Sequence, residues 1–324
     1  MKKILKISLV VLAVTMMVTS FYNFRTEAKT KNKVTYTLKK GTLTIKGKGN
    51  MPKKMVFKGN KKIKKAVIKN GVTSINKSAF ENCKNLKTVK IGKSVTKIGK
   101  KAFYRTKIKN VTIPKAIKTI NKDAFGLCTK LTTVTMPGKK IDCNSTAYAE
   151  PSFLPHVKTI RFTTKLNIKA VTLYDTDNYV VYKKDPKYTS ITGIIYTKDK
   201  KTTVRLPNRK NITIADGCTE FTMESLLYSV YQGGGNFIYN CYNVRTLVLP
   251  KTIKKISKGK GFEVDYSNLE NLYYLKLQNV IVKNKDLSEQ DIKTFTTPFE
   301  MEFITSYVKS EKGDNTITLV KKNK

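Results

Sequence analysis

Residues 86–128 read LKTVKIGKSVTKIGKKAFYRTKIKNVTIPKAIKTINKDAFGLC and contain two copies of one pattern, which extends on both sides from about Ile63 to Met136. Each copy has 22 or 23 residues, and aligning the copies places apolar residues in seven columns. The columns are Ile63/Leu86/Ile108/Leu131, Ala66/Val89/Val111/Val134, Ile68/Ile91/Ile113/Met136, Val72/Val95/Ile117, Ile75/Ile98/Ile120, Ala79/Ala102/Ala124 and Phe80/Phe103/Phe125. A period of this length indicates a repeat architecture.

Each copy predicts a short strand of the form L-x-x-V-x-I, followed by a turn and an apolar arc that ends in Ala-Phe. One copy cannot enclose these side chains alone, so neighbouring copies must stack. Stacked strands lie about 4.8 Å apart and form one parallel sheet, with the apolar columns inside the coil. The sequence therefore predicts a solenoid that combines a parallel β-sheet of short strands with irregular or short-helical arcs.

The consensus L-x-x-V-x-I-P-x-x-V-x-x-I-x-x-x-A-F-x-x-C resembles the BspA-type leucine-rich repeats of bacterial surface and secreted proteins, most clearly from Leu86 to Cys128. Gly41 to Pro52 is similar to the cap that often precedes such repeats, and Gly193 to Pro207 is similar to a hairpin often inserted among them. The resemblance covers roughly residues 35–280 and is strong up to Pro137. It implies a leucine-rich-repeat solenoid of the α+β repeat class, and attachment to host or neighbouring-cell molecules.

Residues 1–28 predict a signal peptide, because three lysines precede an apolar run from Ile7 to Val18 and Thr26-Glu27-Ala28 fits cleavage after Ala28. Cleavage after Ser20 is the alternative, and twelve apolar residues are too few for a membrane anchor. We therefore expect export, with the protein secreted or associated with the cell surface. The remaining predicted segments are an N-terminal cap hairpin (29–62), regular repeats (63–140), degenerate repeats with an inserted hairpin (141–280) and a C-terminal capping segment that contains a hairpin (281–324).

Charge is distributed unevenly along the chain, which has a formal net charge of +42. Residues 29–140 hold 32 Lys or Arg against only Glu81 and Asp123, a net charge of +30, whereas residues 141–324 hold 28 basic and 19 acidic residues. An AT-rich coding bias would favour Lys over Arg, but it would favour Glu equally, and Glu is nearly absent here. The regular repeats are therefore the basic half of the protein.

Lysines also align between repeats, at Lys77/Lys100/Lys122 and at Lys84/Lys107. Stacking sets such like charges about 5 Å apart, where they repel one another modestly and less in salt. A multivalent anion relieves this repulsion and releases its own counterions. We therefore expect these lysines to contact an extended anionic polymer such as teichoic acid, an acidic glycan or, without sequence specificity, nucleic acid. A solvated face without a ligand is the alternative interpretation.

The outward positions of the predicted strands form the open face of the sheet, where leucine-rich repeats generally hold ligands. Small Thr and Asn side chains leave room there for a partner backbone, although Thr is also simply a good strand residue. The predicted ligand-binding residues are Lys65, Thr88, Lys90, Asn110, Thr112, Thr133 and Thr135. The pairs Thr159/Arg161, Thr246/Val248 and Tyr274/Lys276 continue the same face.

Tyrosine has the opposite distribution to lysine, because thirteen of the seventeen lie between Tyr148 and Tyr274. Exposed Tyr offers an amphipathic face for sugars or proteins, and we predict such contacts for Tyr273 and Tyr274. The alternative is that these rings cover irregular packing where the repeat period is lost.

The cysteines and the single histidine give little support for catalysis or metal binding. Cys83 and Cys128 share a column with Thr106 between them, so they lie two strand spacings apart, too far for a disulfide. Cys143, Cys218 and Cys241 leave room for one bridge, and Cys218 and Cys241 are the favoured partners. His156 is the only histidine and belongs to no catalytic motif, so we predict no catalytic residues, no metal site and no cofactor.

These observations predict an exported, non-enzymatic binding or adhesion module whose basic half contacts an anionic extracellular polymer or a cell-surface ligand. The alternative function is a structural cell-wall protein that is held by charge without a specific ligand.

Overall fold

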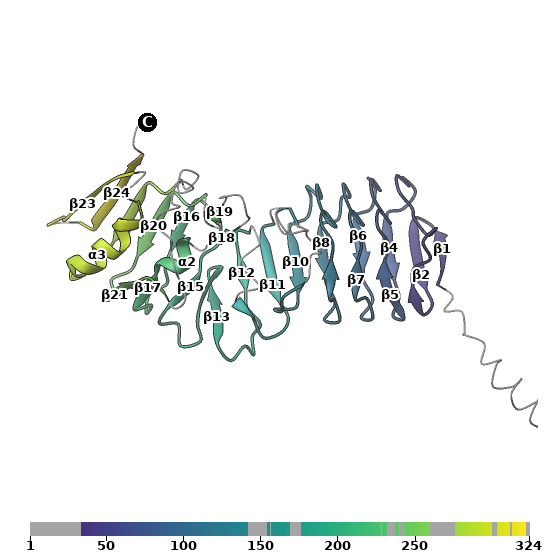
Figure 1. Ribbon diagram of the computed structural model, residues 1–324, viewed down its shortest axis with the longest axis horizontal. Coiled ribbons are helices and arrows are strands. Elements are labelled where there is room, and N and C mark those ends of the chain that lie inside the picture. Colours follow the sequence, from purple (N-terminus) through teal and green to yellow (C-terminus); the bar gives the residue numbers. More distant parts are fainter. Residues whose placement is uncertain are drawn as a thin grey trace, which may run out of the picture.

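The computed structural model describes residues 34–141, 154–155, 157–168, 176–227, 229–231, 237–239, 241, 243–259, 276–299, 303–311 and 313–321. The chain forms an elongated solenoid from β1 at one end to β23 at the other (Figure 1). The predicted signal peptide, His156, Tyr273 and Tyr274 lie outside the described residues.

The first half carries one long face of strands that follow the predicted L-x-x-V-x-I segments. Its strands are β1 (Thr35–Lys39), β2 (Thr42–Lys46), β4 (Lys65–Ile68), β6 (Thr88–Lys90), β8 (Asn110–Thr112), β10 (Thr133–Met136), β11 (Thr159–Phe162) and β12 (Tyr179–Val180). They pair in the orders β1-β2-β4-β6 and β8-β10-β11-β12, in parallel except for the β1–β2 hairpin. The Lys109 N–H donates to the Lys87 carbonyl at 3.4 Å, which joins β8 to β6. The predicted cap hairpin and parallel sheet are confirmed.

A second parallel sheet, which the sequence pattern did not reveal, runs along the arcs. Its strands are β3 (Gly49–Asn50), β5 (Val72–Ile75), β7 (Lys97–Ile98) and β9 (Thr119–Ile120), in the order β3-β5-β7-β9. Each of these strands is only two to four residues long, which is too short for the alternation of apolar and polar residues to predict a strand. Both sheets enclose the apolar columns.

The Ala-Phe segments of the arcs stack as the columns predict. Phe80, Phe103 and Phe125 are fully buried, and adjacent ring centroids lie 5.1 Å apart with nearly parallel planes. The Phe80 N–H donates to the Ala102 carbonyl at 2.7 Å, and the Phe103 N–H donates to the Ala124 carbonyl at 2.8 Å. Main-chain bonds therefore connect the coils in the arcs as well as in the sheets.

Two positions in each arc adopt positive φ without glycine. They are Ser78, Lys101 and Asp123, with φ of 54°, 55° and 57°, and Asn82, Arg105 and Leu127, with φ of 59°, 55° and 52°. This conformation costs about 1–2 kcal/mol for a residue with a side chain. It turns N–H groups toward the next coil: the Ser78 N–H donates to the Lys100 carbonyl and the Asn82 N–H to that of Tyr104, both at 2.9 Å. The contact between coils offsets the local strain.

The second half repeats the two-sheet plan with a longer period. Asn211 of β16 pairs with Thr246 of β20, which pairs with Asn279 of β22, so the spacing is 35 and then 33 residues. The strands of the larger sheet are β16 (Asn211–Thr213), β20 (Thr246–Leu249), β22 (Asn279–Val282), β24 (Asn315–Lys321) and β23 (Phe303–Val308), and those of the smaller sheet are β17 (Glu220–Thr222) and β21 (Lys255–Ser257). The β23–β24 hairpin closes the sheet antiparallel, as predicted for the C-terminal cap.

Insertions and short helices occupy the rest of this half. The predicted inserted hairpin is part of a three-stranded antiparallel sheet of β13 (Tyr188–Ile191), β14 (Ile194–Thr197) and β15 (Thr203–Arg205). A second hairpin joins β18 (Ser229–Tyr231) to β19 (Phe237–Tyr239). The described helices are α2 (Met223–Leu227), α3 (Glu289–Thr296) and the 3-10 turn η3 (Thr297–Phe299). Ser288 caps α3 by accepting from the Asp291 N–H at 3.1 Å.

Buried side chains of the second half account for part of its aromatic content. Tyr179 and Tyr196 are buried in the core, and the Tyr196 hydroxyl accepts a hydrogen bond from the Ala215 N–H at 2.9 Å. Packing is therefore the role of these two rings. The described apolar residues form two clusters, one from Val34 to Ile195 and one from Ile194 to Leu319.

The predicted bridge between Cys218 and Cys241 is wrong. Both residues are buried, and Cys218 is a free thiol. The Cys218 sulfur contacts the Lys201 carbonyl at 3.3 Å, whereas the Cys241 sulfur contacts the Leu206 carbonyl at 3.5 Å. Each sulfur therefore fills a different part of the core.

We predict that Phe103→Ala lowers the free energy of unfolding by about 3–5 kcal/mol, because it leaves a cavity between two stacked rings. Chemical denaturation followed by circular dichroism measures this change. Val56→Ala is the control, because Val56 is 40% exposed and its truncation is expected to cost under about 0.5 kcal/mol. Equal losses for the two variants would contradict a continuous ring stack.

Candidate functional site

The outward positions of β4, β6, β8 and β10 form one surface, which we call the sheet face. Strand register places Lys65 beside Thr88, and Asn110 beside Thr133. The neighbouring row contains Val67, Lys90, Thr112, Thr135 and Arg161. Thr133 and Thr135 are half-buried, and the other five predicted sheet-face residues are exposed: Lys65, Thr88, Lys90, Asn110 and Thr112. All seven predicted open-face residues therefore lie on the same side of the solenoid.

A row of lysines that the sequence reasoning missed borders the sheet face. Lys64, Lys87 and Lys109, which we call the edge lysines, are exposed and directly precede the strands. The Lys87 N–H donates to the Lys64 carbonyl at 3.0 Å, and the Thr132 N–H donates to the Lys109 carbonyl at 2.8 Å. With the bond from the Lys109 N–H to the Lys87 carbonyl at 3.4 Å, they stack the backbones of the three lysines coil upon coil. Their alignment one position after the first apolar column was the available signal.

The predicted column Lys77/Lys100/Lys122, which we call the arc lysines, lies elsewhere. Each lies two residues after the end of a strand of the second sheet, namely β5, β7 and β9. The Lys101 N–H donates to the Lys122 carbonyl at 3.4 Å, so these coils also stack directly. Lys77 and Lys100 are exposed, whereas Lys122 is half-buried. The arc lysines and the sheet face therefore belong to different walls of the solenoid.

Lys84 and Lys107 occupy the turn between these two walls. Both are exposed, and the Lys107 N–H donates to the Leu86 carbonyl at 3.0 Å just before β8 begins. They are closer along the chain to the edge lysines than to the arc lysines. The five residues predicted to bind a polyanion thus do not form a single row.

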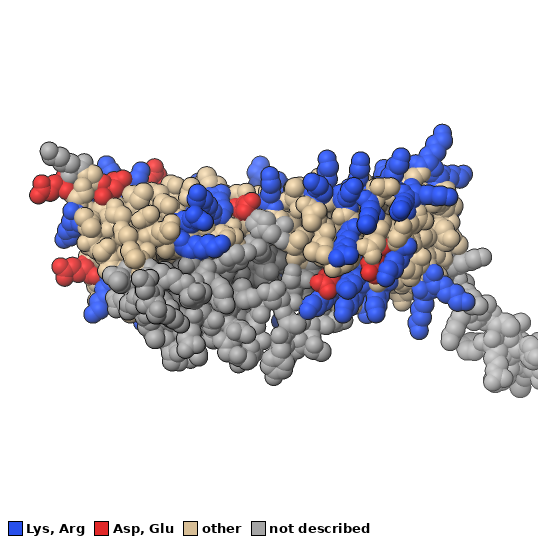
Figure 2. All heavy atoms as spheres, turned by 90° about the horizontal axis from the view of Figure 1, so that it is seen from above, with Lys and Arg blue, Asp and Glu red and all other residues tan. Residues whose placement is uncertain are grey.

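Acidic partners are scarce along this basic half. Lys58 lies 3.3 Å from the Glu81 carboxylate, and a hydrogen bond from Ser78, together with the Lys58 charge, lowers the pKa of Glu81. Glu81 and Asp123 are the only acidic residues between positions 29 and 140. Figure 2 shows Lys and Arg crowding over the N-terminal half of the viewed face, whereas Asp and Glu gather more toward the other end.

The larger sheet of the second half carries a smaller basic feature. A cavity of about 400 Å³ is lined by Arg209, by outward residues of β16 and β20, and by Lys283. The Arg209 guanidinium donates to the Asn178 side chain at 3.1 Å and to the Thr192 carbonyl at 2.8 Å, and burial lowers the pKa of Arg209. Asp216 lines the same cavity, so its charge is mixed.

Buried thiols occupy the cysteine column of the repeats. The Cys83 sulfur contacts the Phe57 carbonyl at 3.1 Å, and Cys128 lies 3.3 Å from the Thr106 hydroxyl. Burial raises the pKa of Cys83 to about 11 and also raises that of Cys128. Among the described residues, no three His, Cys, Asp or Glu side chains gather where they could hold a metal ion.

Family comparison assigns the repeats. The model described as "BspA type Leucine rich repeat region (6 copies)" matches residues 53–178 and 190–312, which is more than half of the chain. The chain belongs to the BspA-type leucine-rich-repeat family. The match includes the second half, where the period is longer and the insertions occur. No protein of curated function matches the sequence.

Several solved structures are similar to this BspA-type chain. A leucine-rich repeat protein from Eubacterium ventriosum has 16% identity and a TM-score of 0.36, over 70% of this chain and 66% of that one. The pneumococcal vaccine antigen PcpA has 14% identity and a TM-score of 0.33, over 78% and 68%. A leucine rich cell surface protein from Faecalibacterium prausnitzii has 20% identity and a TM-score of 0.27, over 70% and 72%.

In the part of the chain that the structure describes, no helix is long and apolar enough to cross a membrane.

We predict that Cys83, Cys128 and Cys218 resist iodoacetamide in the folded protein at pH 8 and react after denaturation. Burial blocks access, and the raised pKa of each thiol lowers the fraction of reactive thiolate at that pH. Mass spectrometry of peptides from native and denatured samples measures the labelling. Rapid labelling of any of the three in the native sample would contradict their burial.

Proposed function

We propose that the protein is an exported, non-enzymatic binding module that contacts an anionic extracellular polymer through the basic half of its solenoid. The observation that carries this proposal is the stacking of lysines at the repeat spacing with almost no acidic residues nearby. A linear polymer with regularly placed negative groups fits such a periodic surface better than a compact ligand does. Membership in a family of bacterial repeat proteins supports a binding role in general terms.

Electrostatics favours a polymer over a single small anion. Neighbouring coils place like charges about 5 Å apart, so each added anion relieves repulsion between several lysines. A polymer also releases its condensed counterions on binding, and its affinity then falls steeply as salt rises. Teichoic acid and acidic glycans are the extracellular polymers that meet these conditions. Nucleic acid meets them too, but without sequence readout.

The sheet face together with the edge lysines is the better candidate surface. It combines the charges of Lys64, Lys87 and Lys109 with the polar side chains of Thr88 and Asn110 beside them. Hydroxyl and amide groups hydrogen-bond to polymer oxygens, and their small size lets a polymer backbone approach the strands. The arc lysines have no comparable adjacent row of exposed Thr and Asn, because Thr73, Thr96 and Thr119 of that wall are half-buried.

A structural wall protein held by charge alone is the second candidate function. Binding would then depend on the number of lysines and be indifferent to which wall carries them.

Two matched variants distinguish these functions. In the first, Lys64, Lys65, Lys87, Lys90 and Lys109 become Gln; in the second, Lys77, Lys84, Lys100, Lys107 and Lys122 become Gln. Each removes five positive charges from exposed or half-exposed sites of the same repeats. The binding of each variant to wall teichoic acid is measured by calorimetry over a salt series.

We predict that the first variant binds at least about tenfold more weakly than the second at low salt. The slope of its log K against log salt should also be shallower, by about 0.7 for each lost contact between a lysine and an anionic group. Equal losses in both variants would favour the structural wall protein held by charge alone. Binding that neither variant weakens would contradict both functions.

A further inference from the structure

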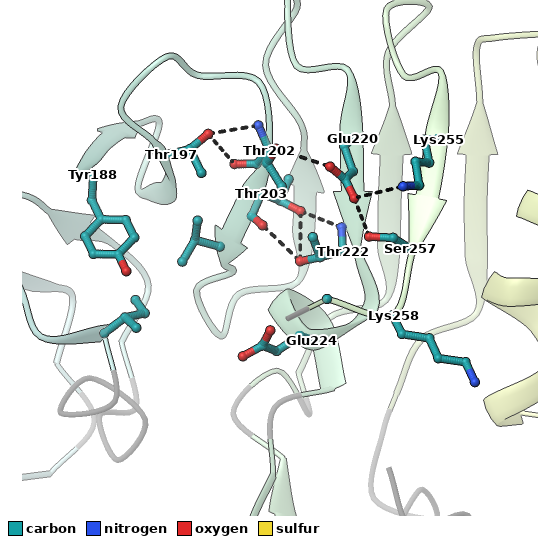
Figure 3. A pocket seen from close by; sticks show the side chains of 13 residues that line it. Tyr188, Thr197, Thr202, Thr203, Glu220, Thr222, Glu224, Lys255, Ser257 and Lys258 are labelled. Atoms are coloured by element: carbon teal, nitrogen blue, oxygen red, sulfur yellow. Dashed lines mark hydrogen bonds and ion pairs between the residues drawn. The ribbon is translucent and has the colours of Figure 1, made fainter. Parts of the chain in front are cut away.

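The second half contains a larger cavity, of about 570 Å³, that lies outside the basic surface (Figure 3). Its walls come from the inserted sheet, through Thr197 of β14 and Thr203 of β15, and from the short sheet β17–β21 with the adjoining helix α2. A volume of this size falls within the range of small-ligand sites in proteins. The inserted sheet therefore forms part of the cavity wall.

One wall of the cavity is a fixed carboxylate network around Glu220. The Ser257 hydroxyl donates to one Glu220 oxygen at 2.5 Å, and the Thr202 hydroxyl donates to the other at 3.4 Å. Lys255 Nζ lies 3.9 Å from the same carboxylate. These neighbours offset the negative charge of Glu220, so its carboxylate does not require a cationic ligand.

The remaining hydroxyl hydrogens of this wall are also donated internally. The Thr197 hydroxyl donates to the Asp199 carboxylate at 2.6 Å, and the Thr222 hydroxyl donates to the Thr203 carbonyl at 2.9 Å. The Thr203 and Thr222 hydroxyl oxygens already accept from the Thr222 and Ser225 N–H groups, at 2.8 and 3.3 Å, so the lone pairs still offered to the cavity are those of Thr197 and Thr202. A ligand that fits such a wall must supply hydrogen-bond donors.

Glu224 of α2 supplies a second carboxylate at the cavity, on which the positive charge of Arg205 acts. It is half-buried at the cavity, and among the described residues no group donates a hydrogen bond to its carboxylate. The backbone of Glu224 is held because its N–H donates to the Lys258 carbonyl at 3.0 Å, and Gly259 leaves space for its side chain. A Cβ on Gly259 would lie 2.7 Å from the carboxylate. Burial raises the pKa of Glu224, and the charge of Arg205 opposes that rise.

The side chains around Glu224 leave room for a cation. Figure 3 shows the Glu224 carboxylate directed toward the side of the cavity where Tyr188 lies, while the Lys258 side chain extends away from it. Burial raises the pKa of Tyr188, and the negative charges of Asp185 and Glu224 raise it further. The Tyr188 ring adds an aromatic face, which attracts cations within about 6 Å.

We propose that this cavity binds a ligand bearing a primary ammonium group, which pairs with the Glu224 carboxylate and donates hydrogen bonds to the threonine wall. The group offers three donors and one positive charge, which match the lone pairs and the half-buried carboxylate. It can belong to an amino sugar or to a lysine side chain. This site is independent of the anionic polymer, because its charge preference is opposite.

The test titrates the chain from Lys29 to Lys324 with four probes and follows binding by saturation-transfer NMR. Glucosamine and Nα-acetyl-lysine amide carry the ammonium group, whereas N-acetylglucosamine and Nα,Nε-diacetyl-lysine amide are their neutral partners. We expect at least one amine to bind saturably and about tenfold or more tighter than its neutral partner. Which amine binds identifies the source of the ammonium group.

Two variants locate the site. Glu224→Gln should weaken the amine about tenfold or more, whereas Glu289→Gln, which removes an exposed carboxylate from the first turn of α3, should leave binding unchanged. Thermal unfolding checks that both variants fold. Equal binding of charged and neutral probes, absence of saturable amine binding, or unchanged binding by Glu224→Gln would each overturn the proposal. The probe comparison on the parent chain needs no variant, so it stands even if Glu224→Gln does not fold.

Discussion

Main-chain hydrogen bonding between successive coils is the constraint on which the rest of this structure depends. When each coil is hydrogen-bonded to the next, residues at equivalent positions of successive repeats are stacked on one another. Apolar positions then become continuous core, and the phenylalanines become a stack with centroids 5.1 Å apart. The same constraint aligns charges that would otherwise be scattered, so a lysine-rich sequence becomes rows of lysines. Fold and charge pattern therefore have one physical origin.

The importance of hydrogen bonding between coils is seen at positions where it is kept despite backbone strain or charge repulsion. Two non-glycine residues in each arc adopt positive φ, and in the first two arcs the N–H groups of these residues (Ser78, Asn82, Lys101 and Arg105) donate to the following coil. Aligned lysines on both walls add electrostatic repulsion that only salt or a polyanion relieves. At the C-terminal end of the solenoid, the parallel stacking stops, and β24 and β23 close the sheet as antiparallel strands. Each of these costs is local, and the described coils stay stacked around them.

The regular half could be predicted almost fully from sequence, because seven apolar columns recur at a constant period. The second parallel sheet could not, since strands as short as Lys97–Ile98 contain no measurable alternation. The edge lysines were missed although Lys64, Lys87 and Lys109 do align, because the core columns dominated the comparison. In the second half, a period of 33 to 35 residues and an inserted three-stranded sheet concealed the repeat. The cavity beside Glu224 depends on contacts between segments far apart in sequence, so no local pattern indicated it.

Charge-driven binding is the central functional claim, and the parent protein tests it most directly. The measurement is the affinity of the chain from Lys29 to Lys324 for wall teichoic acid and for a neutral glycan over a salt series. The account predicts that the anionic polymer binds at low salt with an affinity that falls steeply as salt rises, and that the neutral glycan does not bind. Salt-independent binding, or equal affinity for the neutral glycan, would contradict it.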